Sequence, residues 1–264
     1  MKKCFASLAM LAVLLALPVM ASDSVYGSVT VDGKIGEGEW DNAAWQELSI
    51  VKDAPEASGR IKLMNDDNYL FLLVESTDPT VCDTVSANWN AEMSIDCIEF
   101  WFTDDIAAAA DATAYGTGSI TACLDHLGNF SWNGGDEGAR DSMQTACSTN
   151  GNTTIYEVAI PLMDGTSDIP FGLNVAINDT NDENGSRCGY VVLNEVGQWW
   201  VSPANLGTYT LAEAPVPAAE TVAAEAAAEA TAVTTAPQTM DVVGLLALST
   251  MLLGGTAVLT KKKQ

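Results

Sequence analysis

A carboxylate and an indole are expected on the same face of one β-strand. Apolar residues alternate with other types along Asp96–Phe102, and a period of two is typical of a strand. The alternation turns one set of side chains toward the core and leaves Cys97, Glu99 and Trp101 on the opposite face. An aromatic ring can cover the C–H face of a polyhydroxylated ligand, and a carboxylate can accept hydrogen bonds from its hydroxyl groups. This face is therefore either solvated or part of a cleft for such a ligand.

Oxygen-bearing side chains are concentrated in the segment Asn178–Gly185, which follows a predicted strand. Hard cations such as calcium prefer oxygen ligands of this kind. The spacing is not that of an EF-hand, and a solvated turn is the alternative interpretation. If a calcium ion binds, Asp179, Asp182 and Glu183 are the predicted ligands.

Catalytic patterns are not evident. His126 is the only histidine of the chain, and no nucleophile-elbow sequence accompanies it, so we interpret it as a turn residue. Glycoside hydrolysis needs two suitably spaced carboxylates, and the number of acidic residues leaves that possibility open. Glu99 and Asp96 are expected on opposite faces of one strand, however, and could not flank a single bond. We therefore predict that the protein is not an enzyme.

The elements that must position these residues are short strands. Nine runs rich in β-branched and aromatic residues are separated by Gly, Asp and Asn clusters. They are Val25–Val31, Arg60–Met64, Tyr69–Ser76, Ser94–Thr103, Ser119–Leu124, Thr153–Ile160, Phe171–Asn178, Gly189–Leu193 and Tyr209–Leu211. This spacing predicts an all-β protein, an antiparallel β-sandwich of jelly-roll type. Short helical segments are predicted at Glu39–Glu47, where Trp40 and Trp45 would be core residues, and at Asp104–Ala112.

The charge of the chain excludes one class of partner. The sequence has 264 residues, with 11 Lys and Arg against 35 Asp and Glu, a formal net charge of −24. Such a molecule repels phosphate backbones, so nucleic-acid binding is excluded. Five cysteines follow the first 21 residues, and none are spaced as a metal-thiolate motif. Up to two disulfides or a set of buried thiols are both compatible with them.

Both ends of the chain have the composition of targeting segments. Residues 1–21 combine two lysines, an apolar run and small residues, which predicts a secretory signal peptide, with an uncleaved membrane anchor as the alternative. Residues 242–260 carry no charge and precede three lysines, which predicts a membrane span with the preceding chain outside the cell. Residues 212–236 consist mostly of Ala, Glu, Thr, Pro and Val and are expected to be a linker. The folded body is then residues 22–211.

Several ordered pieces of the body resemble family 9 carbohydrate-binding modules, within the wider group of DOMON-like sandwiches. In chain order they are Val31–Ile35, Asp67–Phe71, Asp96–Phe102, Glu157–Pro161, Phe171–Asp179 and Trp200–Pro203. The resemblance implies a β-sandwich that holds a sugar between two tryptophans. Members of the family can also carry structural calcium.

The resemblance also implies particular site residues. Trp89 and Trp200 match the paired tryptophans, and Glu99 matches the carboxylate beside them, with Trp132 as an alternative to Trp89. The sequence departs from the family at three polar positions. Ser119–Leu124 contains no arginine, Ala176 replaces a glutamine, and Gly197 replaces an asparagine.

The C-terminal segment, residues 237–264, resembles a cell-wall sorting signal of Gram-positive bacteria. A short motif, Ala236-Pro237-Gln238-Thr239-Met240-Asp241, is followed by the apolar run and the basic tail. The resemblance implies that a sortase cleaves after Thr239 and joins the protein to the wall. A retained membrane helix over residues 242–260 is the alternative.

Together these patterns predict a non-catalytic carbohydrate-binding module displayed on the cell surface. The main alternative is an anchored structural or protein-interaction sandwich that does not bind sugar. A haem-binding DOMON relative, for which His126 would be the available axial histidine, and a hydrolase are further alternatives.

Overall fold

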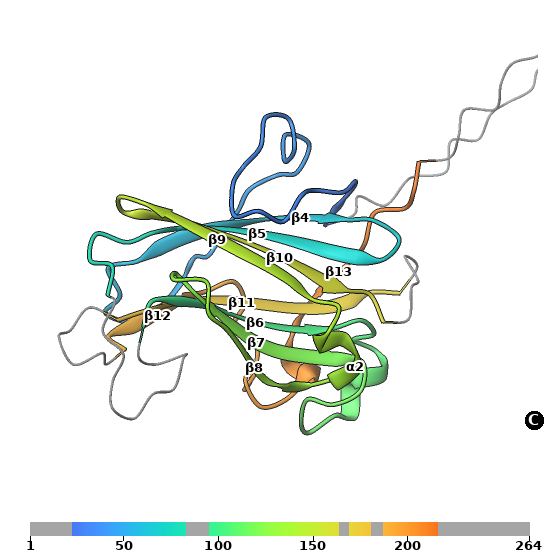
Figure 1. Ribbon diagram of the computed structural model, residues 1–264. Coiled ribbons are helices and arrows are strands. Elements are labelled where there is room, and N and C mark those ends of the chain that lie inside the picture. Colours follow the sequence, from blue (N-terminus) through green and yellow to red (C-terminus); the bar gives the residue numbers. More distant parts are fainter. Residues whose placement is uncertain (1–22, 83–94, 164–168, 181–186, 216–264) are drawn as a thin grey trace, which may run out of the picture. The chain divides into compact units, whose positions relative to one another are not determined.

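The residues that the structure describes form two β-sheets packed face to face, as the two layers of Figure 1 show. The computed structural model describes residues 23–82, 95–163, 169–180 and 187–215. The predicted all-β sandwich is confirmed. The terminal segments 1–21 and 237–264, with Thr239 and the apolar run 242–260, lie outside the described residues. Among the residues that are described, no helix is both long and apolar enough to cross a membrane.

Within the described ranges the first sheet has six strands, and its central strands pair antiparallel. Its order is β1 (Val25–Tyr26), β4 (Ser58–Asn65), β5 (Tyr69–Thr77), β10 (Thr153–Pro161) and β9 (Gln144–Asn150), and β2 (Gln46–Glu47) also pairs with β4.

The second sheet has seven strands in the part of the chain that the structure describes, and β6 and β11 lie side by side near its centre. Its order is β3 (Ile50–Asp53), β12 (Gly189–Val192), β11 (Phe171–Asp179), β6 (Cys97–Thr103), β7 (Ser119–Asp125) and β8 (Phe130–Gly135), and β13 (Gly207–Tyr209) also pairs with β11.

The main core lies between the sheets and follows the two-residue period of the strands. On β6 the side chains of Ile98, Phe100 and Phe102 are fully buried in this core, as predicted. Strand β5 is buried on both faces, because the segment around Trp40 covers its outer side. Glu157 on β10 fixes that segment by accepting a hydrogen bond from Trp40 Nε1 at 3.0 Å.

The outer face of the second sheet is also covered, by the segment between β12 and β13. Trp199 and Leu206 from this segment are buried against Trp101 of β6 and Ala176 of β11. A face that could have been solvated therefore becomes partly enclosed. This enclosure positions the candidate site.

The predicted helix at Glu39–Glu47 was wrong. This segment forms turns and then β2, whose Gln46 and Glu47 pair with β4. A short amphipathic stretch has little helical stability of its own, so pairing with the sheet decides its conformation. Trp40 is a core residue as predicted, whereas Trp45 is only partly buried, with the Arg60 Cζ atom 4.1 Å from its ring centroid.

The other predicted helical segment is shorter than expected. Within Asp104–Ala112 only Ala108–Asp111 is helical, as the 3₁₀-helix η1. The Asp105 side chain accepts a hydrogen bond from the Ala108 amide at 2.8 Å. The described residues also form two short helices that were not predicted, α2 (Glu137–Arg140) and the 3₁₀-helix η2 (Pro203–Asn205).

Candidate functional site

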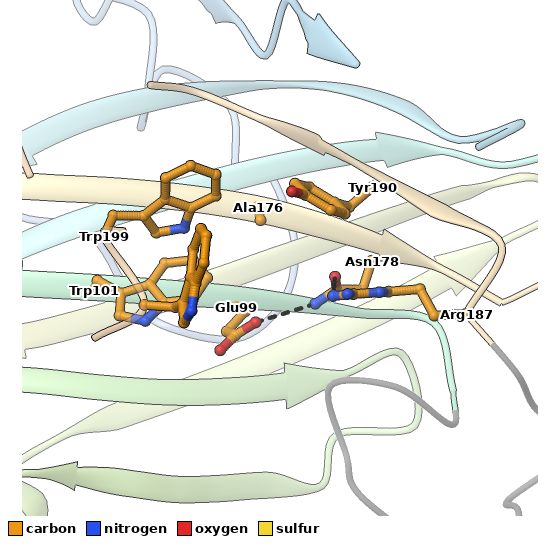
Figure 2. Close-up of a pocket in the computed structure, with 8 residues that line it drawn as sticks. Glu99, Trp101, Ala176, Asn178, Arg187, Tyr190 and Trp199 are labelled. Carbon is orange, nitrogen blue, oxygen red and sulfur yellow. Dashed lines mark hydrogen bonds between the residues drawn. The ribbon is translucent and has the colours of Figure 1, made fainter. Parts of the chain in front are cut away.

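A pocket of about 240 Å³, open to solvent, lies on the outer face of the second sheet. We call it the Trp200 pocket. Its lining comes from β6, β11, β12 and the segments that flank β12: Glu99, Trp101, Ala176, Asn178, Arg187, Tyr190, Trp199 and Trp200 (Figure 2). Residues paired across neighbouring antiparallel strands share a face, and the pairs Glu99–Ala176 and Asn178–Tyr190 place these side chains together.

One wall of the pocket is aromatic. The Trp199 ring stands edge to face against three rings, those of Trp101 (6.4 Å between centroids), Tyr190 (6.4 Å) and Trp200 (4.8 Å). Trp101 and Trp199 are 2% and 3% exposed, whereas Trp200 is 50% exposed. Trp200 is therefore the indole of this wall that can offer a ring face to a ligand, and the other two support it.

The second wall is polar, and its three members form a chain of hydrogen bonds. Arg187 Nη1 donates to Asn178 Oδ1 at 3.0 Å, and Asn178 Nδ2 donates to Glu99 Oε2 at 3.3 Å. The Arg187 guanidinium carbon also lies 4.9 Å from the centroid of the Tyr190 ring. A cation and a carboxylate therefore line the same pocket with an amide between them, as Figure 2 shows.

The backbone that carries Trp199 and Trp200 is held at both ends. The Tyr115 hydroxyl donates to the Trp199 carbonyl, and the Ser202 hydroxyl donates to the Ala112 carbonyl. Burial, and then the charge of Glu99, raise the pKa of Tyr115 well above its ordinary value, so its hydroxyl remains a donor. The aromatic wall is thus anchored to the loop that contains η1.

One departure from the family pattern, Gly197, lies shortly before Trp199. Gly197 has φ +52°, and a Cβ atom there would lie 2.8 Å from Asn205 Cγ. A side chain at this position would combine an unfavourable backbone with a close contact. An asparagine at this position would therefore require the Asn205 side chain to shift.

The structure brings two of the three predicted sugar-binding residues together. Glu99 and Trp200 line the same pocket, and Trp89 lies outside the described residues. Trp132, the alternative to Trp89, lies on β8, where its Nε1 donates to Glu137 at 3.2 Å. It is not among the residues that line the Trp200 pocket.

Sequence reasoning missed several pocket residues. The alternation of β11 could have placed Asn178 on the same face as Ala176, next to Glu99. Arg187 and Trp199 lie in connecting segments without a repeating pattern, so no local signal marked them. Ser119–Leu124 contributes no arginine to the pocket, whereas Arg187 reaches it from another segment.

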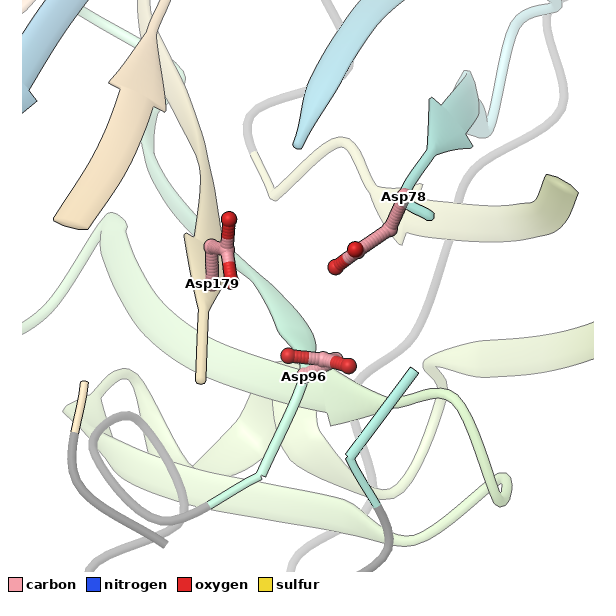
Figure 3. A group of neighbouring side chains, drawn as sticks. All are labelled: Asp78, Asp96 and Asp179. Carbon is pink, nitrogen blue, oxygen red and sulfur yellow. The ribbon is translucent and has the colours of Figure 1, made fainter. Parts of the chain in front are cut away.

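A second polar region lies at the ends of β5 and β11 and just before β6. The side chains of Asp78, Asp96 and Asp179 each place an oxygen within 4.8 Å of the other two (Figure 3). We call this group the acidic cluster. All three residues are buried, at 5%, 6% and 0% exposure. The predicted ligands Asp182 and Glu183 lie outside the described residues, so the acidic cluster joins Asp179 to two residues that were not predicted.

Backbone amides satisfy part of the acidic cluster. Asp96 accepts hydrogen bonds from the amides of Cys82 at 2.6 Å and Thr180 at 2.8 Å. Asp179 Oδ2 accepts from the amides of Glu56 and Ala57, whereas Asp179 Oδ1 is buried and has no hydrogen-bond partner among the described residues. A buried oxygen without a partner is costly unless a proton, water or cation approaches it.

Burial changes the acidity of the acidic cluster. Desolvation is the main cause that raises the pKa of Asp96 to about 7, and the negative charges of Asp78 and Asp179 add to it. Desolvation likewise raises the pKa of Asp78. A bound divalent cation would remove this penalty, and three carboxylates are suitable oxygen ligands for calcium.

His126 lies in a turn directly after β7. It is 6% exposed, follows β7, and its Nδ1 lies 3.2 Å from the Asp96 carbonyl oxygen. The turn at Gly128, with φ +89°, comes two residues later. The interpretation of His126 as a turn residue agrees with this environment.

The two-sheet fold and the half-open aromatic and polar pocket define a class of protein, the β-sandwich binding domain. A model of one such family, described as carbohydrate family 9 binding domain-like, matches residues 31–214. The chain belongs to this family, and carbohydrate binding is the function that the match supports.

Relatives of known structure share the fold. A family 9 carbohydrate-binding module from Caldicellulosiruptor kristjanssonii in complex with glucose has a TM-score of 0.63 and 22% identity, and the match covers 73% of this chain and 95% of that one. Its complex with cellotriose has a TM-score of 0.62 and 22% identity, covering 74% and 97%.

A curated relative is much longer than the matching region. The protein is 28% identical over 213 residues to exoglucanase XynX of Acetivibrio thermocellus. The match covers 77% of this chain but 18% of the exoglucanase, so the chain spans about a fifth of that enzyme's length.

Proposed function

We propose that the protein is a non-catalytic carbohydrate-binding module, displayed at the cell surface, which binds a saccharide in the Trp200 pocket. The observation that carries the proposal is that a half-exposed indole and a carboxylate line one pocket, Trp200 and Glu99. The ring of Trp200 would stack against the C–H face of a pyranose, and Glu99 would accept hydrogen bonds from its hydroxyl groups. A neutral glucan is the favoured ligand, because the similar modules were solved with glucose and cellotriose.

Trp89 is proposed as the second aromatic contact of the sugar. This role rests on the resemblance of its position to the family's first tryptophan. Trp200 alone gives one stacking surface, and a second ring would enclose the sugar on both sides. The substitution Trp89→Ala should therefore also weaken binding.

Titration of the full chain with glucose and cellotriose, followed by tryptophan fluorescence, tests this function. We expect saturable binding by the unmodified protein and loss of binding in Trp200→Ala. Trp132→Phe is the matched control, because Trp132 lies on β8 and does not line the pocket. If neither these sugars nor a wider panel of soluble glycans bind, the protein-interaction alternative is favoured.

The proposed location at the cell surface rests on the ends of the sequence. A signal peptide at residues 1–21 would export the chain, and a sortase cut after Thr239 would attach it to the cell wall. Residues 212–236 would then hold the sandwich away from the wall. Many weak sites on one cell would bind a polysaccharide firmly through avidity. Mass spectrometry of wall-released protein tests the position of the C-terminus.

We also propose that the acidic cluster binds a structural calcium ion. The supporting observation is Asp179 Oδ1, a buried oxygen without a hydrogen-bond partner among the described residues. Asp78, Asp96 and Asp179 would supply carboxylate oxygens, and Asp182 and Glu183 are further predicted ligands from the following loop. Calorimetric titration of chelator-treated protein with calcium chloride tests this site, and Asp179→Asn should abolish the heat of binding.

A further inference from the structure

The polar wall of the Trp200 pocket combines an obligate donor and an obligate acceptor. Arg187 can only donate hydrogen bonds, and ionised Glu99 can only accept them. Asn178 contacts both, through Nη1 of Arg187 at 3.0 Å and Oε2 of Glu99 at 3.3 Å. The amide is 1% exposed, so this middle member is fixed within the sheet.

The guanidinium is held in a defined orientation. One N–H group is directed to Asn178, and the Tyr190 ring lies 4.9 Å from the guanidinium carbon. Because the guanidinium is planar, fixing one N–H group and one face also fixes the directions of the other N–H groups. Arg187 is partly exposed and lines the pocket, so the group is accessible to a ligand.

We infer that Arg187 determines the specificity of the pocket: Arg187 and Glu99 together bind two neighbouring hydroxyl groups of a neutral saccharide that rests on Trp200. A hydroxyl group both donates and accepts, so one hydroxyl can donate to Glu99 while the next accepts from Arg187. This inference rests on the proposed function and adds to it the part of the sugar that is recognised.

The charges in the pocket favour a neutral ligand over an acidic one. An isolated arginine would attract a carboxylated or sulfated sugar, but the carboxylate of Glu99 is joined to Arg187 through a single amide. The two charges compensate each other, and the chain as a whole carries a formal charge of −24. Long-range repulsion and the local carboxylate therefore both oppose an anionic sugar.

A purely structural role of Arg187 makes a different prediction. Arg187 precedes β12, and its bond to Asn178 ties this segment to β11. If that were its whole function, a substitution of Arg187 would disorder this segment and weaken the binding of all sugars equally. If Arg187 recognises the sugar, the substitution instead removes the preference for one particular hydroxyl group.

The test compares glucose with the monodeoxyglucoses, each of which lacks one hydroxyl group, by calorimetry on the full chain. The unmodified protein should bind glucose about tenfold more tightly than two deoxyglucoses that lack adjacent hydroxyl groups. Arg187→Gln should lower the affinity for glucose about tenfold and abolish the preference for the hydroxyl group at one of the two positions. Glu99→Gln should reduce the preference at the other position. Arg187→Lys keeps the charge without the planar donor array and should restore only part of the affinity.

Arg140→Gln is the matched control, because it removes the same charge from α2, outside the pocket lining. We expect the Arg140→Gln variant to bind glucose and each deoxyglucose as the unmodified protein does. Near-ultraviolet circular dichroism checks that the Arg187 variants fold. If Arg187→Gln does not fold, the comparison of Arg187→Lys with the unmodified protein still decides the test.

The outcomes separate this inference from the proposed function. If the unmodified protein binds none of these sugars, the proposed function and this inference are both wrong. If it binds glucose, but the Arg187 variants retain every hydroxyl preference, the inference alone is wrong. Tighter binding of glucuronic acid than of glucose would also contradict it.

Discussion

Two consecutive residues of β11 belong to two different polar regions. Asn178 faces the Trp200 pocket, and Asp179 belongs to the acidic cluster on the other side of the sheet. Both side chains are almost completely buried, at 1% and 0% exposure. Asn178 joins groups of opposite charge, whereas Asp179 lies beside two groups of its own charge.

This contrast indicates which region can remain empty at low cost. In the Trp200 pocket Asn178 uses both its donor and its acceptor within the protein, so its order does not depend on a ligand. In the acidic cluster the burial of like charges raises the pKa of Asp96 to about 7 and leaves Asp179 Oδ1 without a partner among the described residues. The empty pocket should therefore cost the protein little stability, whereas the empty acidic cluster should cost it more.

The largest expected effect is the loss of sugar binding in Trp200→Ala. Removal of the stacking surface should weaken cellotriose binding about 100-fold, or about 3 kcal/mol, the range of an interface hot spot. Because Trp200 is 50% exposed, the melting temperature should fall by less than about 3 °C. Fluorescence titration and differential scanning calorimetry measure the two quantities. A large fall in the melting temperature with unchanged affinity would instead make Trp200 a packing residue.

Calcium should stabilise the protein through the acidic cluster. At a free concentration about 30 times Kd, a ligand that binds only the folded state contributes about 2 kcal/mol. For a domain of this size the melting temperature should then rise by about 4–8 °C over the chelated protein. Asp179→Asn should remove this increase, and Asp111→Asn, which alters an exposed acid in η1, should retain it. An equal increase in both variants would place the calcium effect elsewhere.

Most of the sandwich could be predicted because its central strands are buried and regular. The predicted runs coincide with β5, β6, β10 and β11 to within a few residues. Strands such as β9 were missed, since its seven residues are mostly polar and it lies at the edge of the first sheet. An edge strand buries little surface, so its sequence carries a weak periodic signal.

The site could be predicted only where it follows strand geometry. Glu99 and Trp101 were expected on one face of β6 because alternate residues share a face, and the pocket contains both. The contribution of Arg187 depends on its contacts with Asn178 and Tyr190, and no local sequence pattern predicts these contacts. The partners of Asp179 were missed for the same reason, because Asp78 and Asp96 approach it only after the sheets assemble.

The stability of the chelated protein should decrease as the pH rises. The pKa of Asp96 is raised from 3.8 to about 7 in the folded state, so the folded state binds more protons than the unfolded state between these values. Its contribution is present below about pH 4 and is lost as the pH approaches 7, with a slope of up to about 1 kcal/mol per pH unit. Urea unfolding between pH 5 and pH 7 measures this slope.

Asp96→Asn provides the comparison for the pH experiment. The variant cannot titrate at this position, so its slope should be smaller, and the raised pKa of Asp78 would account for a residual slope in the same direction. Saturating calcium should also reduce the slope in the unmodified protein, because the ion stabilises the charged carboxylates. Identical slopes in the two proteins would remove Asp96 as the cause.

The smallest expected effect is coupling between the two regions. The Asp179 carbonyl accepts a hydrogen bond from the Cys188 amide at 2.9 Å, and Arg187 is the preceding residue. A cation that orders Asp179 should therefore also order Asn178 and Arg187, and we expect calcium to tighten cellotriose binding about threefold, or about 0.6 kcal/mol. Linkage requires cellotriose to raise the affinity for calcium by the same factor. Calorimetry of each ligand with and without the other measures both factors. Equal affinities would show that Asn178 and Asp179 are energetically independent, which the complete hydrogen bonding of Asn178 would then explain.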